Sequence, residues 1–282
     1  MKSKFCIIIP IYKEELDCTE KLSLKRLVKV IGQNNYPIFL VKPTSLNCDN
    51  YYKIINKDKV REISFDDKYF VDTKAYSQLC INYDFYNKFS VYEYMYIYQL
   101  DCYIFEDHLK DWCDFGYDYI GAPILATNAG WNTVNSRTNK WEPVVGNGGF
   151  SLRKISTFLD LTNPEGEFRK YYNITDELTS KVVYEDKYFC NDLYRFYDLE
   201  LPNWLYASRF SWDMNVDLYK KYFNIEYLPM AVHAWPKNIR YWQDKIEEIK
   251  NDKGNIIVNF CEEKYKDFFK EYYNENNDTI KV

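Results

Sequence analysis

A short apolar run that ends in a carboxylate constrains the fold of this chain most. The run from Tyr94 to Leu100 is rich in aromatic and β-branched residues, and Asp101 follows it directly. Such residues favour strands, and a run without polar alternation is typical of a strand that is buried on both faces. Burying an unpaired carboxylate is costly. We therefore expect Asp101 at the end of a central strand, where it is either paired or binds a ligand.

The segments around this run alternate between strands and helices. Apolar runs predict strands at 5–9, 37–41 and 60–65, and apolar residues at helical spacing predict helices over 15–31 and 73–89. This alternation is typical of parallel strands joined by right-handed crossovers. We therefore expect an α/β fold with a Rossmann-like, mostly parallel central sheet and flanking helices. Ligands of such sheets bind at the carboxyl ends of the strands.

The second half of the chain has a different character. A polar, irregular segment covers 128–141, and a strand interrupted by glycines follows at 144–153. The other predicted elements are helices over 184–197, 211–223, 237–250 and 262–273 and a short strand at 230–235. We expect a single domain over residues 1–282 that ends in a helical tail (244–282).

Composition excludes some classes of function. The net charge is −5 and the isoelectric point about 5.3, whereas non-specific nucleic-acid binding needs a basic surface. The eight cysteines include no Cys-x-x-Cys pair, and with two histidines a Cys/His zinc site is not expected. Free thiols are typical of a reducing compartment. The apolar run after Lys4 is too short for a signal peptide or a membrane span, so we expect a cytoplasmic protein.

The order of several motifs resembles that of GT-A type glycosyltransferases. The motifs are FCIIIPIYKE (5–14), YQLDCYIF (98–105), GAP (121–123), GNGGFSLRK (146–154), YED (184–186) and VHAW (232–235). Their order is similar to that of one bacterial family, long labelled as a domain of unknown function and now grouped with glycosyltransferases. The resemblance covers roughly residues 4–243, and it implies a nucleotide-binding half (1–125) and an acceptor and catalytic half (126–243). It implies that the first motif meets the nucleotide base and that YQLD occupies the place of the Asp-x-Asp motif.

Five residues are candidates for binding the nucleotide. We expect UDP near Pro10, Tyr12, Gln99 and Asp101, because these residues belong to segments placed at strand ends. Arg153 could face a phosphate or a surface acid.

Two residues are candidate metal ligands. Transfer of a sugar from a nucleotide diphosphate requires neutralisation of the departing diphosphate, which a divalent cation or cationic side chains can supply. Asp101 and His233 could each provide one ligand to Mn²⁺ or Mg²⁺. The third position of the motif is Tyr103, so a second carboxylate is missing there. The alternatives are that Asp101 pairs with a Lys or Arg and that His233 is a hydrogen-bonded core residue.

The glycine-containing strand and several tryptophans are candidates for contacting the sugar. Glycine allows close approach of a ligand to the backbone, so a sugar could lie against Asn147, Gly148 and Gly149. The alternative is a β-bulge or a tight bend. The candidate sugar platforms are the tryptophans Trp131, Trp141, Trp204, Trp212 and Trp235. Each of them, taken singly, is more typical of core or edge packing, and Trp235, next to His233, is the preferred candidate.

The acids Glu185 and Asp186 open a predicted helix and are the candidate catalytic residues. Asp186 could accept the proton of the acceptor hydroxyl, which is the function of the base in inverting transferases. Glu185 could contact the acceptor. The alternative is helix capping, because acids are favoured at helix N-termini.

These observations predict a glycosyltransferase of the hexosyltransferase class. We expect an inverting enzyme that moves a sugar from a UDP-sugar to a saccharide or glycolipid acceptor, in surface polysaccharide or lipooligosaccharide synthesis. Synthesis of this kind would place the protein at the inner face of the membrane, with peripheral membrane association. The alternative is a non-catalytic nucleotide- or carbohydrate-binding protein on the same fold. A glycoside hydrolase would need two carboxylates that flank one bond.

Overall fold

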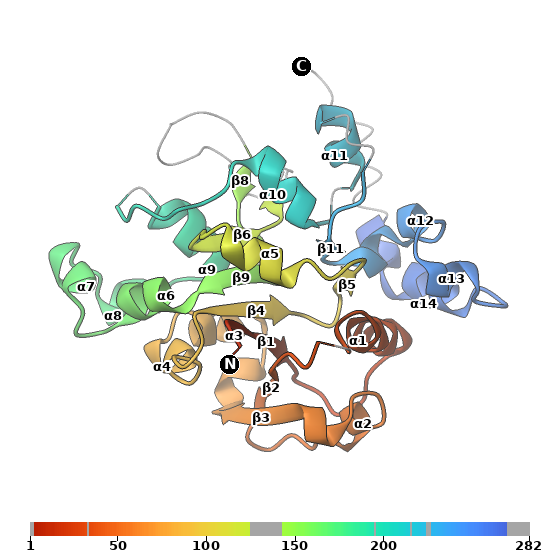
Figure 1. Cartoon of the computed structure of the whole chain (residues 1–282), viewed down its shortest axis with the longest axis horizontal. Coiled ribbons are helices and arrows are strands. Elements are labelled where there is room, and N and C mark those ends of the chain that lie inside the picture. The colour runs from red at the N-terminus through yellow and green to blue at the C-terminus, as the bar shows by residue number, and fades with distance from the viewer. Residues whose placement is uncertain are drawn as a thin grey trace.

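A six-stranded sheet forms the centre of the fold in the part of the chain that the computed structural model describes, residues 3–32, 34–124, 143–194, 196–214, 216–223 and 227–269. The strands, in their order across the sheet, are β3 (Val60–Phe65), β2 (Ile38–Pro43), β1 (Phe5–Pro10), β4 (Tyr94–Tyr98), β9 (Phe150–Lys154) and β6 (Tyr119–Gly121). Figure 1 shows them stacked from β3 at the bottom of the view upward. Strands β3, β2, β1 and β4 are mutually parallel, which confirms the predicted α/β class. Strand β9 is antiparallel to both β4 and β6.

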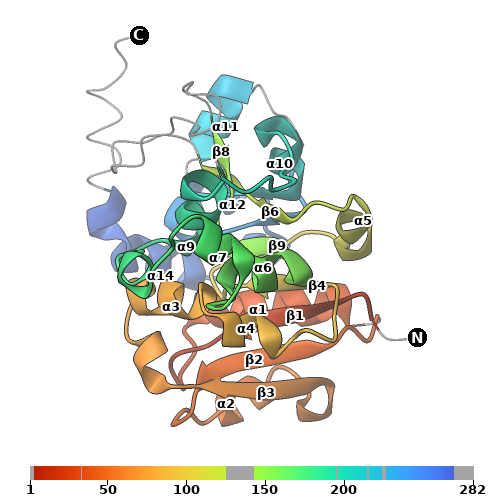
Figure 2. The ribbon, with the colours of Figure 1, turned by 90° about the vertical axis from the view of Figure 1, so that its left-hand side faces the viewer.

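Helices cover both faces of this sheet. Those of the first half are α1 (Cys18–Ile31), α2 (Asp49–Tyr52), α3 (Thr73–Cys80), α4 (Tyr83–Asn87) and α5 (Leu109–Asp114). Those of the second half are α6 (Ile155–Thr162), α7 (Glu167–Tyr171), α8 (Asp176–Thr179), α9 (Glu185–Lys187), α10 (Trp204–Phe210), α11 (Val216–Phe223), α12 (Ile239–Trp242), α13 (Glu247–Lys250) and α14 (Ile256–Lys264). Short 3₁₀ segments lie at Lys57–Lys59, Asp67–Phe70 and Trp235–Asn238. In Figure 2, α3, α4, α6, α7 and α9 lie together on the side that faces the viewer.

Alternate residues of the central strands pack into two hydrophobic cores, one on each face of the sheet. Phe5, Ile7 and Ile9 of β1 pack with α1 on one face, and Cys6 and Ile8 pack with α3, α4 and α6 on the other. Side chains of a strand point alternately to its two faces, so a strand with helices on both sides must be apolar throughout. This is why the apolar runs without alternation identified these strands correctly.

The N-terminus of α1 is fixed by a capping box. Asp17 accepts hydrogen bonds from the backbone N–H groups of Thr19 and Glu20, and the Glu20 side chain accepts one from the backbone N–H of Asp17. Reciprocal capping of this kind satisfies amide groups that have no partner inside the helix. Helix α1 therefore begins at a defined point close to the carboxyl end of β1.

A second, small sheet joins distant parts of the chain. It consists of β10 (Ser211–Trp212), β11 (Ala231–Val232) and β5 (Tyr103–Ile104), and β11 runs antiparallel to β5. A third hydrophobic core packs around it, with Trp212, Trp235 and Trp242 at its centre. A further pair, β7 (Pro123–Ile124) and β8 (Val144–Val145), flanks the glycine-containing segment.

Several predicted helices differ from the structure. The helix expected over 73–89 is divided, because the Asn82 side chain accepts a hydrogen bond from the backbone N–H of Asp84 and starts α4. The helix expected over 184–197 is the short α9 followed by a π-helical turn over Tyr188–Asp192. The helix expected over 211–223 begins later, because Ser211 and Trp212 pair with β11. The helix expected over 237–250 is divided into α12 and α13, and α14 begins earlier than the helix expected over 262–273. Residues 270–282 lie outside the described residues.

Other expectations concern thiols and membrane spans. All eight cysteines lie in the described ranges, and all are free. Within those ranges, no helix has the length and apolarity needed to cross a bilayer. The division of the chain at residues 125 and 243 stays a prediction.

Candidate functional site

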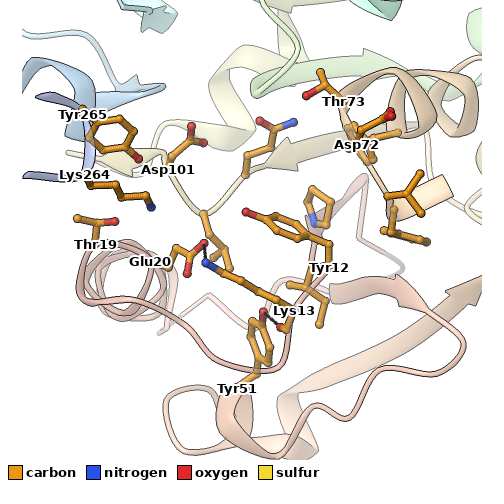
Figure 3. A pocket seen from close by; sticks show the side chains of 17 residues that line it. Tyr12, Lys13, Thr19, Glu20, Tyr51, Asp72, Thr73, Asp101, Lys264 and Tyr265 are labelled. Atoms are coloured by element: carbon orange, nitrogen blue, oxygen red, sulfur yellow. Dashed lines mark hydrogen bonds and ion pairs between the residues drawn. The ribbon is translucent and has the colours of Figure 1, made fainter. Parts of the chain in front are cut away.

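A pocket of about 420 Å³ lies at the carboxyl ends of β1 and β4. Four of the five residues predicted to bind the nucleotide line it, namely Pro10, Tyr12, Gln99 and Asp101. Strand β4 ends at Tyr98, and a turn in which the Cys102 N–H bonds the Gln99 carbonyl follows at once. Parallel strands bring their carboxyl ends to one edge of a sheet, which is why segments distant in sequence meet here (Figure 3).

Gln99, Asp101 and His233 bring three donor atoms together beside this pocket. His233 Nε2 lies 3.3 Å from Asp101 Oδ1 and 3.2 Å from Gln99 Oε1. The antiparallel pairing of Val232 with Tyr103 produces this contact across more than a hundred residues of sequence. The predicted proximity of Asp101 and His233 is therefore found in the structure.

A left-handed turn fixes the chain after His233. Ala234 has φ 52°, a conformation that residues with a Cβ rarely adopt. The turn allows the backbone N–H of Trp235 to bond the carbonyl oxygen of Asp101 at 3.3 Å. Strained backbone often occurs at functional sites.

Asp213 is a site residue that sequence reasoning missed. Its Oδ1 lies 2.9 Å from His233 Nδ1, and its Oδ2 accepts a hydrogen bond from Asn147 Nδ2 at 3.2 Å. Since a carboxylate only accepts hydrogen bonds, His233 donates from Nδ1, and Nε2 is directed toward Asp101. Asp213 was missed because the sequence predicts a helix over 211–223. The available signal for a strand end at Asp213 was the strand-like Ser211–Trp212 pair before it.

The charges of this cluster shift the pKa of its members. Burial alone would lower the pKa of His233, but the carboxylates of Asp101 and Asp213 raise it to about 10. Burial alone would raise the pKa of Asp101, but the imidazolium of His233 lowers it. Without a metal, the imidazolium thus balances two carboxylates.

The donor set fits a divalent cation. Neighbouring ligands of an octahedral cation, each about 2.1 Å from it, lie about 3 Å apart, close to the Nε2–oxygen separations found here. A histidine ligand usually donates its other N–H to a carboxylate, as His233 does to Asp213. Among the described residues, no three His, Cys, Asp or Glu side chains form a site by themselves. The Gln99 amide oxygen lies beside His233 Nε2 and could complete such a set, whereas the Tyr103 hydroxyl donates to Glu248.

The glycines at 148 and 149 leave room for side chains of this chain, a reason for them that the sequence did not show. A Cβ on Gly149 would lie 2.2 Å from the His233 ring, and one on Gly148 would lie 2.5 Å from Glu185 Oε1. The Asn147 side chain accepts a hydrogen bond from the Gly149 N–H, at 2.9 Å. Contact of a sugar with this loop stays a prediction.

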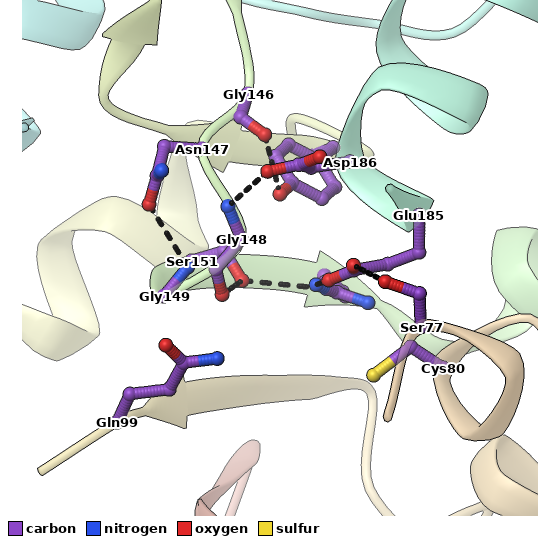
Figure 4. A network of polar contacts seen from close by, with 12 residues as sticks. Ser77, Cys80, Gln99, Gly146, Asn147, Gly148, Gly149, Ser151, Glu185 and Asp186 are labelled. Atoms are coloured by element: carbon purple, nitrogen blue, oxygen red, sulfur yellow. Dashed lines mark hydrogen bonds and ion pairs between the residues drawn. The ribbon is translucent and has the colours of Figure 1, made fainter. Parts of the chain in front are cut away.

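Arg153 is not at the nucleotide pocket, contrary to its predicted function. It is fully buried, and its guanidinium donates to Glu185 Oε1 at 3.0 Å and to the Tyr86 hydroxyl at 3.0 Å. Figure 4 shows Glu185 of this network beside Ser77. Arg153 lies two residues from Ser151 on β9, whose hydroxyl also accepts from it. The strand therefore directs Arg153 into the helix-covered face rather than toward a phosphate or the surface.

Glu185 is held in the same network, which corrects its assignment as a catalytic residue. Its second oxygen accepts a hydrogen bond from the Ser77 hydroxyl at 2.9 Å, and the residue is 6% exposed. Both carboxylate oxygens are thus engaged by buried partners, and no contact places Glu185 toward an acceptor.

Asp186 has different partners from Glu185. Its Oδ2 accepts a hydrogen bond from the Gly148 N–H at 3.1 Å, and its Oδ1 accepts one from the Lys187 N–H at 2.7 Å. Asp186 lies in the first turn of α9, where an acid is favoured by the helix dipole, and its bond from the Lys187 N–H fits that alternative, whereas its bond from the Gly148 N–H reaches outside the helix. Burial, and next the charge of Glu185, raise the pKa of Asp186 to about 7. Asp186 is thus bonded to Gly148 and is the neighbour in sequence of Glu185, which forms the buried ion pair with Arg153.

Trp235 does not offer a sugar platform in this structure. It is fully buried, and its Nε1–H donates to the Ser23 hydroxyl at 3.0 Å. The left-handed turn at Ala234 directs it into the third core. Two other tryptophans considered as platforms, Trp131 and Trp141, lie outside the described residues.

The fold is that of the GT-A glycosyltransferases. Mouse xyloside xylosyltransferase 1 (apo form) superimposes with a TM-score of 0.54 at 10% identity, covering 81% of this chain and 97% of that chain. The galactosyltransferase LgtC, solved with donor and acceptor sugar analogs, gives a TM-score of 0.52 at 11% identity, covering 80% and 86%. The apo bifunctional glycosyltransferase WbbM gives 0.53 at 12% identity, covering 93% of this chain and 52% of that one.

The chain belongs to the family described as "Protein of unknown function (DUF5672)", whose sequence model matches residues 59–233. No curated protein matches its sequence significantly. At these low identities, the structural likeness establishes the fold and leaves the activity to be argued from the site.

Proposed function

We propose that this protein is a glycosyltransferase that uses a nucleotide-diphosphate sugar, most simply a UDP-sugar, and a divalent cation. The observation that carries the proposal is the convergence of Gln99, Asp101 and His233 beside a pocket at the carboxyl ends of parallel strands. The acceptor in this proposal is a saccharide or a glycolipid.

The polar residues of the site have distinct functions in this proposal. Asp101 and His233, with Gln99 beside them, would hold Mn²⁺ or Mg²⁺, which would stabilise the negative charge that develops on the departing diphosphate. Asp213 orients His233. Asp186, whose pKa is raised by burial to about 7, accepts the proton of the acceptor hydroxyl. A base in this position implies inversion at the anomeric carbon.

Asp101→Ala is expected to weaken UDP binding in the presence of Mn²⁺ by roughly 1.5–3 kcal/mol, the range for contacts that involve charged groups. Titration calorimetry with UDP measures this loss directly. The matched control is Asp114→Ala, which removes an acid that pairs with Lys4 at the surface. Unchanged UDP affinity in folded Asp101→Ala would remove Asp101 from the site.

Asp213→Asn is expected to lower Mn²⁺ affinity roughly 10- to 100-fold, as removal of a carboxylate behind a metal-bound histidine usually does. The amide cannot hold the imidazole as strongly, and its NH2 end must face a donor, either the His233 Nδ1–H or the Asn147 Nδ2–H. Electron paramagnetic resonance of free Mn²⁺ provides the measurement, with the exposed Asp217→Asn on α11 as control. Equal Mn²⁺ affinity in the two variants would show that His233 needs no such orientation.

Two assays separate this proposal from its alternatives. Release of UDP that depends on an added acceptor supports transfer, whereas binding of UDP-sugar without any turnover indicates a non-catalytic binding protein. Hydrolysis of a plain glycoside without nucleotide would indicate a hydrolase.

A further inference from the structure

The C-terminal helix α14 contributes to the wall of the pocket. Lys264 and Tyr265, at its end, line the pocket together with Asp101 and the N-terminal turn of α1. Helix α14 packs against α1, and both lie on the same side of the molecule in Figure 1. The family match ends at residue 233, so this part of the wall lies beyond it.

Lys264 is held at the pocket by Asp17, an acid whose carboxylate has hydrogen-bond partners besides this lysine. Its Nζ lies 2.7 Å from Asp17 Oδ2, and the lysine side chain is 37% exposed. Asp17 also accepts hydrogen bonds from the backbone N–H groups of Thr19 and Glu20 and from the Thr19 hydroxyl. The ammonium group could therefore turn to another anion while Asp17 remained hydrogen-bonded.

The pocket is asymmetric in a way that suggests how a nucleotide would lie. In Figure 3, Lys264 and Tyr265 lie on the same side as Asp101, and Tyr12, Asp72 and Thr73 lie across the pocket from them. The Lys264 ammonium group and Asp101 are thus grouped together, opposite the exposed Tyr12 ring. The other lysine of the lining, Lys13, lies next to Tyr12, and its ammonium group pairs with Glu20 at 2.9 Å. A diphosphate needs cationic partners, whereas a base needs an aromatic or apolar surface.

We propose that Lys264 binds the diphosphate of the nucleotide donor, so that α14 is a wall of the donor site rather than a tail. This inference rests on the proposed function. On donor binding, the Lys264 ammonium shifts from Asp17 to a phosphate oxygen, and no covalent bond changes. The competing explanation is that the Lys264–Asp17 ion pair only fastens α14 to α1.

Three variants distinguish the two explanations. Lys264→Met removes the ammonium and keeps most of the apolar stem. Asp17→Asn breaks the ion pair but keeps a residue that is equally suited to the helix N-cap. Lys266→Met is the matched control, because Lys266 lies two residues away and pairs with Glu263 outside the pocket. Calorimetry with UDP and with UMP, each in Mn²⁺, gives the affinities, and thermal melting confirms folding.

Binding of the diphosphate by Lys264 predicts a specific pattern. Lys264→Met lowers UDP affinity roughly 10- to 100-fold, as expected for a charge-assisted contact, and lowers UMP affinity much less. Asp17→Asn keeps or increases UDP affinity, and Lys266→Met leaves it unchanged. If the Lys264–Asp17 ion pair only anchors α14 to α1, Lys264→Met and Asp17→Asn are expected to lose affinity equally, for both nucleotides.

The failures of the two proposals can be told apart. Wild-type binding of UDP with equal binding by Lys264→Met overturns the assignment of Lys264 and leaves the proposed function standing. Absence of binding by the wild-type protein to UDP, GDP, ADP and CDP in Mn²⁺ overturns both.

Discussion

Asp186→Asn is expected to lower turnover roughly 10²–10⁴-fold while leaving donor affinity nearly unchanged, because asparagine keeps the shape of the side chain but cannot take up a proton at neutral pH. The two hydrogen bonds that Asp186 accepts, from Gly148 and Lys187, can be kept by the amide oxygen only in part. Steady-state kinetics with the correct donor and acceptor give kcat and KM separately. The exposed Asp176→Asn on α8 serves as control.

The pH dependence gives a second test of the same residue. Transfer requires the ionised carboxylate, and burial, with the Glu185 charge, raises the pKa of Asp186 to about 7. The kcat/KM of the wild-type protein is therefore expected to rise through about pH 7 and then to level off. The Asp186→Asn variant should lack this rise. Near-wild-type turnover by Asp186→Asn would exclude Asp186 as the base.

Stability should respond to pH in the opposite direction. Because the pKa is raised in the folded state, the folded protein binds more protons than the unfolded chain between about pH 4 and pH 7. The stability contributed by protonated Asp186 is therefore present at low pH and is lost as the pH rises through 7. Asp186→Asn is expected to be more stable than the wild type above pH 7, and this readout is independent of any substrate.

Arg153→Met is expected to lower the free energy of unfolding by about 3–5 kcal/mol, the usual range when one member of a buried ion pair is removed. The substitution leaves the Glu185 carboxylate buried, with Ser77 as its remaining polar partner. Urea denaturation followed by circular dichroism measures the loss. Arg240→Met is the control, because Arg240 pairs with Glu262 at the surface, where such pairs contribute at most about 1 kcal/mol.

The double variant Arg153→Met with Glu185→Gln tests the cause of this loss. Removing the charge of Glu185 removes the buried unpaired carboxylate, so the double variant is expected to be more stable than Arg153→Met alone. If the double variant is the less stable of the two, packing of the arginine rather than its charge explains the effect.

The sequence predicted the strands well because their physical signature is local. Residues of β1 and β4 are apolar in every position, since helices cover both faces of the sheet. The position of Asp101 followed from the same pattern, because a carboxylate after such a run can be accommodated only at its end.

The site residues that sequence reasoning misplaced depend on contacts that no local pattern encodes. Arginine is usually a surface residue, so the burial of Arg153 could be inferred only from its partner Glu185, which is 32 residues away. The burial of Trp235 follows from a left-handed residue, Ala234, whose side chain gives no hint of that conformation. The contact of Asp213 with His233 requires strands of only two residues, too short to show a period.

The position of β9 between β4 and β6 has a consequence for how the chain is made. A growing polypeptide that has left the ribosome as far as β6 already holds β1 to β4. Strand β4 then presents an open edge, because its partner β9 begins only at Phe150, well after β6 ends at Gly121. Open edges of apolar strands are sites of intermolecular association. The interval before β9 emerges is therefore when a nascent chain of this family most needs protection by a chaperone, and fragments that end before residue 150 should aggregate rather than fold.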